Sequence, residues 1–244
     1  MRETRLIMGM PITIDAANPD AVAAAFAWFE EVDARFSPFK PESEVSALNR
    51  CEIAPEAVSA DTREVLELAE ATRIATDGYF DIMRPDGRMD PSGIVKGWAI
   101  RKAARLIAAM GLSDYCVEAG GDVQCAGHND LGAPWRVGIR NPFDETRIVK
   151  VLQPGNAGVA TSGSYVRGAH IYDPHAPSAV LSEIVGLTVV AGDICDADRF
   201  ATAAFAMGRD GIGFIEATPG LEGYAIDRHG TATMTSGFRR LEAR

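Results

Sequence analysis

The chain has 244 residues, of which 47% are hydrophobic and 24% are charged, a composition typical of a globular protein. This composition excludes a disordered or fibrous class, and the length allows one large or two modest domains. The formal net charge of −10 at pH 7 argues against nucleic-acid binding, because the phosphate backbone attracts basic surfaces.

Helical patterns dominate the first half of the chain. The N-terminal stretch LIMGMPITI predicts a strand, and the apolar run within MRETRLIMGMPITIDA is too short for a signal peptide. Helices are expected at about 20–35, in a short segment capped by Ser43, at 61–78 with a stop at Gly78, and at 93–111. The segment 78–93 between the last two is irregular, since it contains Pro-Asp-Gly and Asp-Pro.

Short strands alternate with turns in the second half. They are expected at YCVEA, DVQCAG, WRVGIR, RIVKVLQ, NAGVATSG, HIYDP and EIVGLTVVAG, followed by helices near 196–207 and 210–217 and a final hairpin, GYAIDR with TATMTSGF. Helices grouped early and strands later predict an α+β fold rather than a doubly wound βαβ sheet. No stretch reaches transmembrane length and the four cysteines show no CxxC spacing, so a cytoplasmic protein without a membrane anchor or disulfides is expected.

The stretch CDADRFATAAFAMG combines an apolar helix with polar side chains on one face. Asp198 and Thr202 are four residues apart and therefore adjacent on a helix. Asp193, Asp196 and Asp198 also stand where the helix begins, where carboxylates cap free N–H groups and complement the helix dipole. The pair is therefore either a capping feature or part of a Mg²⁺ site, since Mg²⁺ prefers oxygen ligands.

Lys96 is expected in the first turn of the helix that Ser92 caps. A cation there opposes the helix dipole, which predicts that methionine at this position does not lower the stability of the ligand-free protein. An anion bound at the helix end would remove the unfavourable interaction, and Asp90 lies at the same end. A solvated lysine and a capping aspartate are the alternatives.

Three further segments contain chemically capable residues that are not specific singly. The turn in EAGGD, Glu118 to Asp122, can approach a ligand or close a tight hairpin. ATSGSY and AHIYDP have the character of a loop and a return strand, and His170 is by itself more often structural than catalytic. Nucleotide loops of the GxGxxG and GxxxxGK[ST] types are absent from the sequence.

The order of these segments resembles the FAD:protein FMN transferases, the ApbE family. The resemblance runs through MGM at Met8, SPFKPESEVSALN, DGYFD, DPSGIVKGWA, EAGGDVQCAG, PWRVGI, VATSGSY, HIYDP and TVVAGDICDADRFATAAFAMG. These nine segments cover most of the chain in the family's order. The resemblance implies a single ApbE-like domain over residues 1–244, with a T-fold-like, mainly antiparallel sheet packed with helices.

The resemblance also implies an activity and a set of site residues. Members of the family bind FAD and Mg²⁺ and transfer FMN to a Thr or Ser hydroxyl of an acceptor protein, with release of AMP. Asp198 and Thr202 match the metal-binding pair, Gly93 matches the position whose carbonyl completes the metal site, and His170 matches a histidine proposed to assist the attack. Asp198 is also expected to be catalytic. The flavin-nucleotide positions fall on Met8, Phe39, Tyr79, Phe80, Asp81, Asp90, Lys96 and Tyr172.

The sequence departs from the family pattern at three points. Phe39 stands where a tyrosine is common, so plain stacking is expected to replace a polar ring contact. Only IMRPDGRM lies between Asp81 and Asp90, where many members have a long insertion that contributes to a lid. The lipobox of exported members is absent. A hydrolase that converts FAD to FMN and AMP, and a non-catalytic FAD-binding protein, remain the alternative functions.

Overall fold

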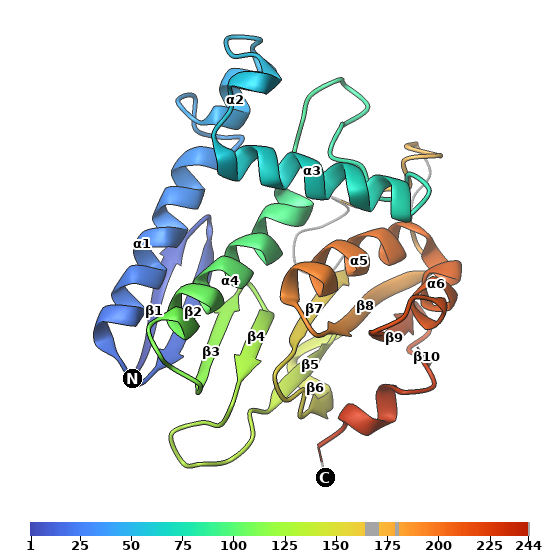
Figure 1. Ribbon diagram of the computed structural model, residues 1–244. Coiled ribbons are helices and arrows are strands. Elements are labelled where there is room, and N and C mark those ends of the chain that lie inside the picture. The colour runs from blue at the N-terminus through green and yellow to red at the C-terminus, as the bar shows by residue number, and fades with distance from the viewer. Residues whose placement is uncertain (164–170, 179–180, 244) are drawn as a thin grey trace.

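The computed structural model describes residues 1–163, 171–178 and 181–243, which form a mixed α+β fold built on one large sheet (Figure 1). The strands are β1 (Arg2–Ile7), β2 (Met10–Ala16), β3 (Tyr115–Ala119), β4 (Asp122–Ala126), β5 (Val137–Asn141), β6 (Asp144–Leu152), β7 (Gly158–Gly163), β8 (Ile184–Ala191), β9 (Leu221–Asp227) and β10 (Ala232–Met234). The α-helices are α1 (Pro19–Phe36), α2 (Glu44–Asn49), α3 (Ala60–Ala75), α4 (Ser92–Ala109), α5 (Ile194–Ala206) and α6 (Gly211–Ala217). Short 3₁₀ turns lie at Pro55–Ala57, Gly208–Asp210 and Phe238–Leu241. The α+β expectation is therefore confirmed.

The large sheet has eight strands in the order β1-β2-β3-β4-β7-β8-β9-β10. Each described pairing between neighbouring strands is antiparallel. The single N-terminal strand expected from LIMGMPITI is wrong: β1 and β2 form a hairpin whose turn is Met8-Gly9, with φ angles of 56° and 70°. Positive φ at both central residues is the type I′ geometry that matches strand twist, but Asn or Asp rather than Met usually occupies the first position.

Helices α1, α4 and α5 cover one face of the sheet, and α3 crosses over α4 and α5 (Figure 1). Their inward faces carry the period expected of amphipathic helices. Trp98 of α4 is fully buried, with its ring centroid 5.2 Å from that of Trp28 and 5.3 Å from that of Phe36, both on α1. Burial of this aromatic cluster fixes α4 against α1, so that the first turns of α4 are held over the sheet.

A second apolar cluster lies on the other face of the sheet. The β5–β6 hairpin and the turn at Phe238–Leu241 cover it, and Tyr224 and Phe238 stack there with ring centroids 5.4 Å apart. One further strand expectation is wrong. Residues 171–174 of the HIYDP segment form a loop rather than a strand, and His170 lies outside the described residues. Within the described part of the chain, no helix combines the length and apolar character needed to span a membrane.

Candidate active site

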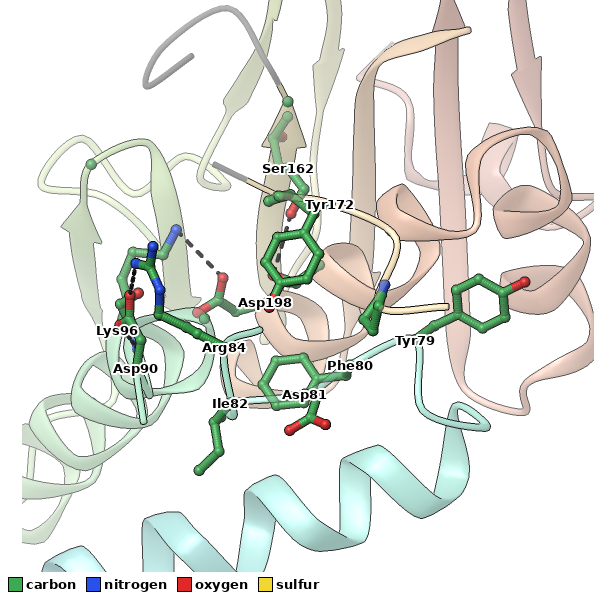
Figure 2. A pocket seen from close by; sticks show the side chains of 18 residues that line it. Tyr79, Phe80, Asp81, Ile82, Arg84, Asp90, Lys96, Ser162, Tyr172 and Asp198 are labelled. Carbon is green, nitrogen blue, oxygen red and sulfur yellow. Dashed lines mark hydrogen bonds and ion pairs between the residues drawn. The ribbon is translucent and has the colours of Figure 1, made fainter. Parts of the chain in front are cut away.

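A cavity of about 380 Å³ opens where α4, α5 and the end of β7 meet the loop after α3 and the loop 171–174 (Figure 2). Segments distant in sequence therefore converge on one space. Of the residues expected at a site, nine line it: Tyr79, Phe80, Asp81, Asp90, Gly93, Lys96, Tyr172, Asp198 and Thr202.

Three expected site residues are not among the lining residues. Met8 occupies the β1–β2 turn, where it packs against the main core. Phe39 is 92% exposed and lines a second cavity of about 390 Å³. This second cavity shares Arg84 and Asp90 with the first, so an extended ligand could reach both. His170 lies outside the described residues.

Asp198 is buried where α5 approaches α4. Its Oδ2 accepts a hydrogen bond from the Gly97 backbone N–H at 2.8 Å, and its Oδ1 lies 3.4 Å from Lys96 Nζ. In a regular helix the Gly97 N–H donates to the Gly93 carbonyl. The Asp198 carboxylate therefore competes with that carbonyl for the same N–H donor. Burial raises the pKa of Asp198 from 3.8 to about 7, with Lys96 opposing the rise and the neighbouring Asp122 carboxylate adding to it. Asp198 is thus not a surface cap, unlike Asp193, which accepts from the Cys195 N–H at 2.8 Å.

Thr202 lies one turn after Asp198 and faces the same cavity. Its Oγ1 is 3.5 Å from the Ser162 hydroxyl at the end of β7. A Cβ placed on Gly93 would lie 3.6 Å from the Thr202 methyl carbon, so the start of α4 runs directly beside this turn of α5. Helices α4 and α5 therefore bring the Asp198 carboxylate, the Thr202 hydroxyl and Gly93 to the same cavity.

Asp122 is the functional candidate that the sequence analysis did not assign. It is 1% exposed at the first position of β4, and its Oδ2 lies 2.5 Å from Lys96 Nζ. Its Oδ1 accepts a hydrogen bond from the Thr161 N–H at 3.1 Å. In the sequence, the signal for Asp122 was a carboxylate directly after Gly120-Gly121. A tight hairpin accounts for the two glycines without a ligand, so the carboxylate was not assigned a role. Arg84, whose Nη1 lies 3.5 Å from Asp90, and Ser162 also line the cavity without having been assigned.

The start of α4 differs from the expectation in two respects. The helix begins at Ser92, whose N–H donates to Asp90 Oδ1 at 3.1 Å. The side chain that accepts a helix N–H at this end is therefore that of Asp90 and not that of Ser92. Lys96 is consequently the fifth helical residue, and its charge is compensated by Asp122 and Asp198 rather than left against the helix dipole. These ion pairs run against the expectation that Lys96 can be replaced without loss of stability, because its ammonium has buried carboxylate partners.

Lys96→Met is expected to destabilise the ligand-free protein. Removing one partner of a buried ion pair costs roughly 3–5 kcal/mol, and the 18% exposure of the Lys96 side chain places the effect toward the lower end. Chemical denaturation of the metal-free protein measures the change, with Lys150→Met as the control. Lys150 forms an ion pair with Glu242 at 2.9 Å, but its side chain is more exposed, at 26%. Equal stability losses in the two variants would contradict the prediction.

Aromatic side chains line the same cavity. Figure 2 shows Phe80 and Tyr172 among its lining residues, and the Phe80 ring lies beside Gly93, since a Cβ placed on Gly93 would be 3.3 Å from Phe80 Cε2. The Tyr79 ring lies edge-on to the His175 ring, with centroids 4.6 Å apart, and His175 Nε2 is 2.9 Å from the Asp77 carbonyl oxygen. These contacts hold the loop 171–178 against the loop that follows α3, and so join two walls of the cavity.

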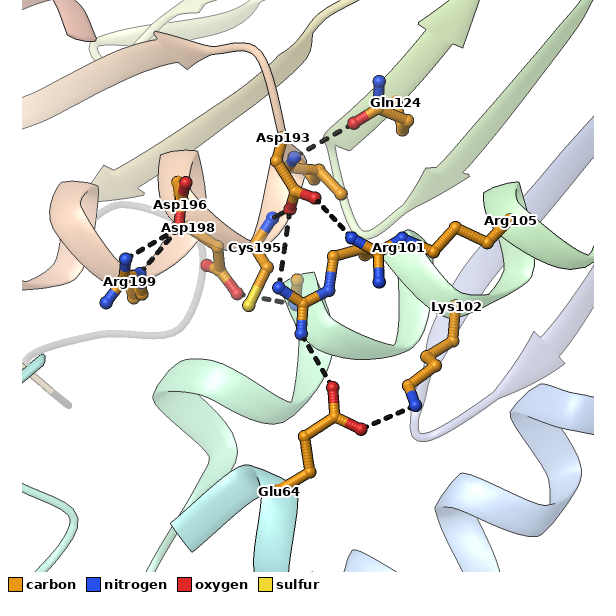
Figure 3. A network of polar contacts seen from close by, with 12 residues as sticks. Glu64, Arg101, Lys102, Arg105, Gln124, Asp193, Cys195, Asp196, Asp198 and Arg199 are labelled. Carbon is orange, nitrogen blue, oxygen red and sulfur yellow. Dashed lines mark hydrogen bonds and ion pairs between the residues drawn. The ribbon is translucent and has the colours of Figure 1, made fainter. Parts of the chain in front are cut away.

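A network of charged side chains holds the helices together beside the cavity (Figure 3). Arg101 of α4 lies 3.1 Å from Glu64 of α3 and 4.0 Å from Asp193 at the start of α5. Lys102 also reaches Glu64, at 2.6 Å. Because Arg101 is only 12% exposed, this network resists relative movement of the helices that supply Lys96 and Asp198.

The donor set fits a hard divalent cation. Asp198 offers a carboxylate, Thr202 a hydroxyl and Gly93 a main-chain carbonyl, the oxygen types that Mg²⁺ prefers. Two buried carboxylates face one ammonium group, which leaves a negative charge for a cation to balance. Across residues 1–163, 171–178 and 181–243, no cluster of three or more His, Cys, Asp or Glu side chains is placed to hold a metal, so any site here depends on hydroxyl and carbonyl ligands.

Comparison with known proteins gives consistent matches. A profile described as "ApbE family" matches residues 8–84 and 83–225. A FAD:protein FMN transferase of Vibrio cholerae is 33% identical over 135 residues, which are 52% of this chain and 40% of that protein. One from Escherichia coli K12 is 32% identical over 160 residues, 62% of this chain and 46% of that protein.

A solved structure, "Flavin Transferase ApbE from Vibrio cholerae", superimposes with a TM-score of 0.86 at 25% identity, covering 99% of this chain and 98% of that one. The ApbE protein of Thermotoga maritima shares the fold, with a TM-score of 0.86 at 21% identity. The sequence matches span less than half the length of the two curated relatives. The family profile, in contrast, matches most of this chain. The chain therefore belongs to the ApbE family.

Proposed function

We propose that residues 1–244 act as a single Mg²⁺-dependent FAD:protein FMN transferase domain, which moves FMN from FAD to a Thr or Ser hydroxyl of an acceptor protein and releases AMP. The observation that carries the proposal is one cavity lined both by Lys96, Asp198 and Thr202 and by the aromatic side chains of Tyr79, Phe80 and Tyr172. A flavin nucleotide combines a diphosphate with an aromatic ring system, which these two kinds of side chain suit. The names of the curated relatives support the same activity.

The proposed transfer makes one bond and breaks one. The acceptor oxygen bonds to the phosphorus of the FMN half of FAD, and the bond from that phosphorus to the bridging oxygen breaks, so that AMP leaves with the bridging oxygen. The proton of the acceptor hydroxyl passes to a base, for which the family resemblance proposes His170. Lys96 binds the diphosphate, and Asp198, Thr202 and the Gly93 carbonyl hold Mg²⁺. When bound there, Mg²⁺ neutralises diphosphate charge and stabilises the leaving phosphate.

The proposal is tested by incubating the protein with FAD, Mg²⁺ and candidate acceptor proteins from the same cell. Mass spectrometry of the acceptor is expected to find FMN on a Thr or Ser peptide, with one AMP released per FMN attached. Rapid formation of FMN and AMP without a modified peptide would instead support the hydrolase. Binding of FAD without AMP release would support a non-catalytic FAD-binding protein.

The protein is expected to bind FAD more tightly than FMN, and FMN more tightly than riboflavin. Ring stacking on Tyr172 serves all three ligands, whereas Lys96 contributes only where phosphate is present. Titration of the three flavins by fluorescence quenching, with Mg²⁺ present, measures the order. Equal affinity for riboflavin and FAD would contradict a phosphate contact in this cavity.

A further inference from the structure

Asp122 is a buried carboxylate with two fixed partners. It begins β4 directly after the Gly120-Gly121 turn, where both glycines have positive φ angles, 58° and 97°. One oxygen accepts the Thr161 N–H of β7 at 3.1 Å, and the other lies 2.5 Å from Lys96 Nζ. Because a backbone N–H anchors it, the carboxylate cannot follow a lysine that moves elsewhere.

Lys96 consequently lies between two carboxylates at unequal distances. Its Nζ is 2.5 Å from Asp122 Oδ2 and 3.4 Å from Asp198 Oδ1. Both carboxylates are almost fully buried, with side chains 2% and 5% exposed, so their attraction for the ammonium is weakly screened. The ammonium is therefore held closer to Asp122 than to Asp198, although both carboxylates lie within ion-pair distance of it.

We propose that Asp122 is a positioning residue that holds the Lys96 ammonium away from Asp198, so that Asp198 can bind a divalent cation while Lys96 serves the diphosphate. The inference rests on the proposed function and adds to it a residue with no assigned role. Without the Asp122 charge, Asp198 is the remaining carboxylate within 4 Å of the Lys96 ammonium among the described residues, so the lysine pairs with Asp198 and competes there with the metal. Outer partners of metal ligands typically change metal affinity 10–100-fold when they are replaced.

Two other roles for Asp122 make different predictions. If Asp122 only ties β4 to β7, asparagine keeps an oxygen for the Thr161 N–H and leaves metal binding unchanged. If Asp122 is itself a metal ligand, its replacement costs metal affinity whether or not Lys96 is present. Only a positioning role makes the effect of Asp122→Asn depend on Lys96.

The experiment is a double-mutant cycle with Mn²⁺ as the probe, read by electron paramagnetic resonance of free Mn²⁺ and by competition with Mg²⁺. The proteins are the wild type, Asp122→Asn, Lys96→Met and the double variant, all at full length and without FAD. Thr188→Val is the matched control, since Thr188 is buried on the next strand, β8, and bonds the Thr161 hydroxyl at 2.8 Å. Thermal unfolding confirms that each variant is folded.

Asp122→Asn is expected to weaken Mn²⁺ binding about 10–100-fold in the wild-type background. In the Lys96→Met background the same change should cost less than about threefold, the scatter of independent substitutions. Thr188→Val should bind Mn²⁺ as the wild type does. If Asp122→Asn alone does not fold, Asp122→Ser takes its place in both backgrounds, because it also removes the charge; a loss confined to the background with Lys96 supports the positioning role, and an equal loss or no loss overturns it.

An equal loss in both backgrounds, or no loss in either, would overturn the positioning role, as would a wild-type protein with no affinity for Mn²⁺. Failure of the proposed function has a separate signature. A protein that shows the expected Mn²⁺ cycle and binds FAD, but forms no FMN-peptide with any acceptor, would refute the transferase and leave the role of Asp122 in place.

Discussion

Asp198→Asn is expected to abolish Mg²⁺-dependent turnover of FAD while the protein remains folded. The substitution removes the only carboxylate among the three proposed metal ligands, and the neutral amide is a poor ligand for a hard cation. A loss of at least about 10²-fold at saturating FAD is expected, comparable to the removal of a group that stabilises developing charge. Rates of AMP release measured across a range of Mg²⁺ concentrations test this, because a lost ligand also raises the Mg²⁺ requirement.

Asp196→Asn is the matched control for this prediction. Asp196 lies two residues before Asp198 in α5, but it pairs with Arg199 at 2.7 Å and its side chain is 41% exposed. An ion pair whose carboxylate is exposed contributes little to stability, about 0–1 kcal/mol, and Asp196 is not among the residues that line the cavity, so turnover should stay near the wild-type rate. Normal activity of Asp198→Asn at limiting Mg²⁺ would show that Asp198 does not bind the metal and only joins α5 to the Gly97 N–H of α4.

Asp198→Asn is also expected to change how the stability of the metal-free protein depends on pH. The pKa of Asp198 is about 7 in the folded state, above its ordinary value of 3.8, so the folded protein binds a proton more tightly than the unfolded chain. The ionised carboxylate therefore destabilises the fold increasingly as pH rises from about 4 to 7, and asparagine avoids this. The difference in unfolding free energy between Asp198→Asn and the wild type should therefore grow in favour of the variant over that range and stay constant above it. Urea denaturation with a chelator present measures this difference.

The helices could largely be read from the sequence, because their signals are local. Ser43 caps α2 by accepting the Ser46 N–H at 3.0 Å, as its position before an apolar run indicated. The β1–β2 hairpin was missed, since Met8 occupies a turn position that usually carries Asn or Asp. The strand expected at HIYDP failed because alternation over so few residues does not distinguish a strand from a loop held by side chains, here through His175.

The sequence predicts only part of the site, because one of its residues is brought in by tertiary packing. The resemblance identified Asp198, Thr202 and Lys96 as members of one site, and all three line one cavity. Asp122 lies 26 residues after Lys96 in the sequence, and only the packing of β4 beside α4 brings its carboxylate to that ammonium. Capping and dipole arguments treat each helix alone, so they assigned Lys96 an unfavourable position. The buried partners supplied by the sheet and by α5 reverse that conclusion.

Helices α4 and α5 approach each other closely at Gly97. A Cβ placed on Gly97 would lie 2.7 Å from Asp198 Cβ and 3.0 Å from the Ile194 carbonyl oxygen, closer than packed atoms tolerate. The Gly97 N–H also donates to Asp198 Oδ2 at 2.8 Å. A single methyl group here must therefore separate the helix that supplies Lys96 from the helix that supplies Asp198.

Gly97→Ala is consequently expected to lower both stability and turnover. Helix propensity alone favours alanine by about 1 kcal/mol, but overpacking of a rigid contact typically costs 1–3 kcal/mol, and here the loss of the Asp198 hydrogen bond adds to it. A displacement of about 1 Å between catalytic groups can reduce turnover by roughly 10²-fold. Gly213→Ala on α6 is the control: its Cβ would meet no atom within 4 Å, so it should stabilise the protein by about 0.5–1 kcal/mol with normal turnover. If Gly97→Ala behaved like this control in denaturation and AMP-release assays, the close contact of α4 with α5 could not be what aligns Lys96 with Asp198.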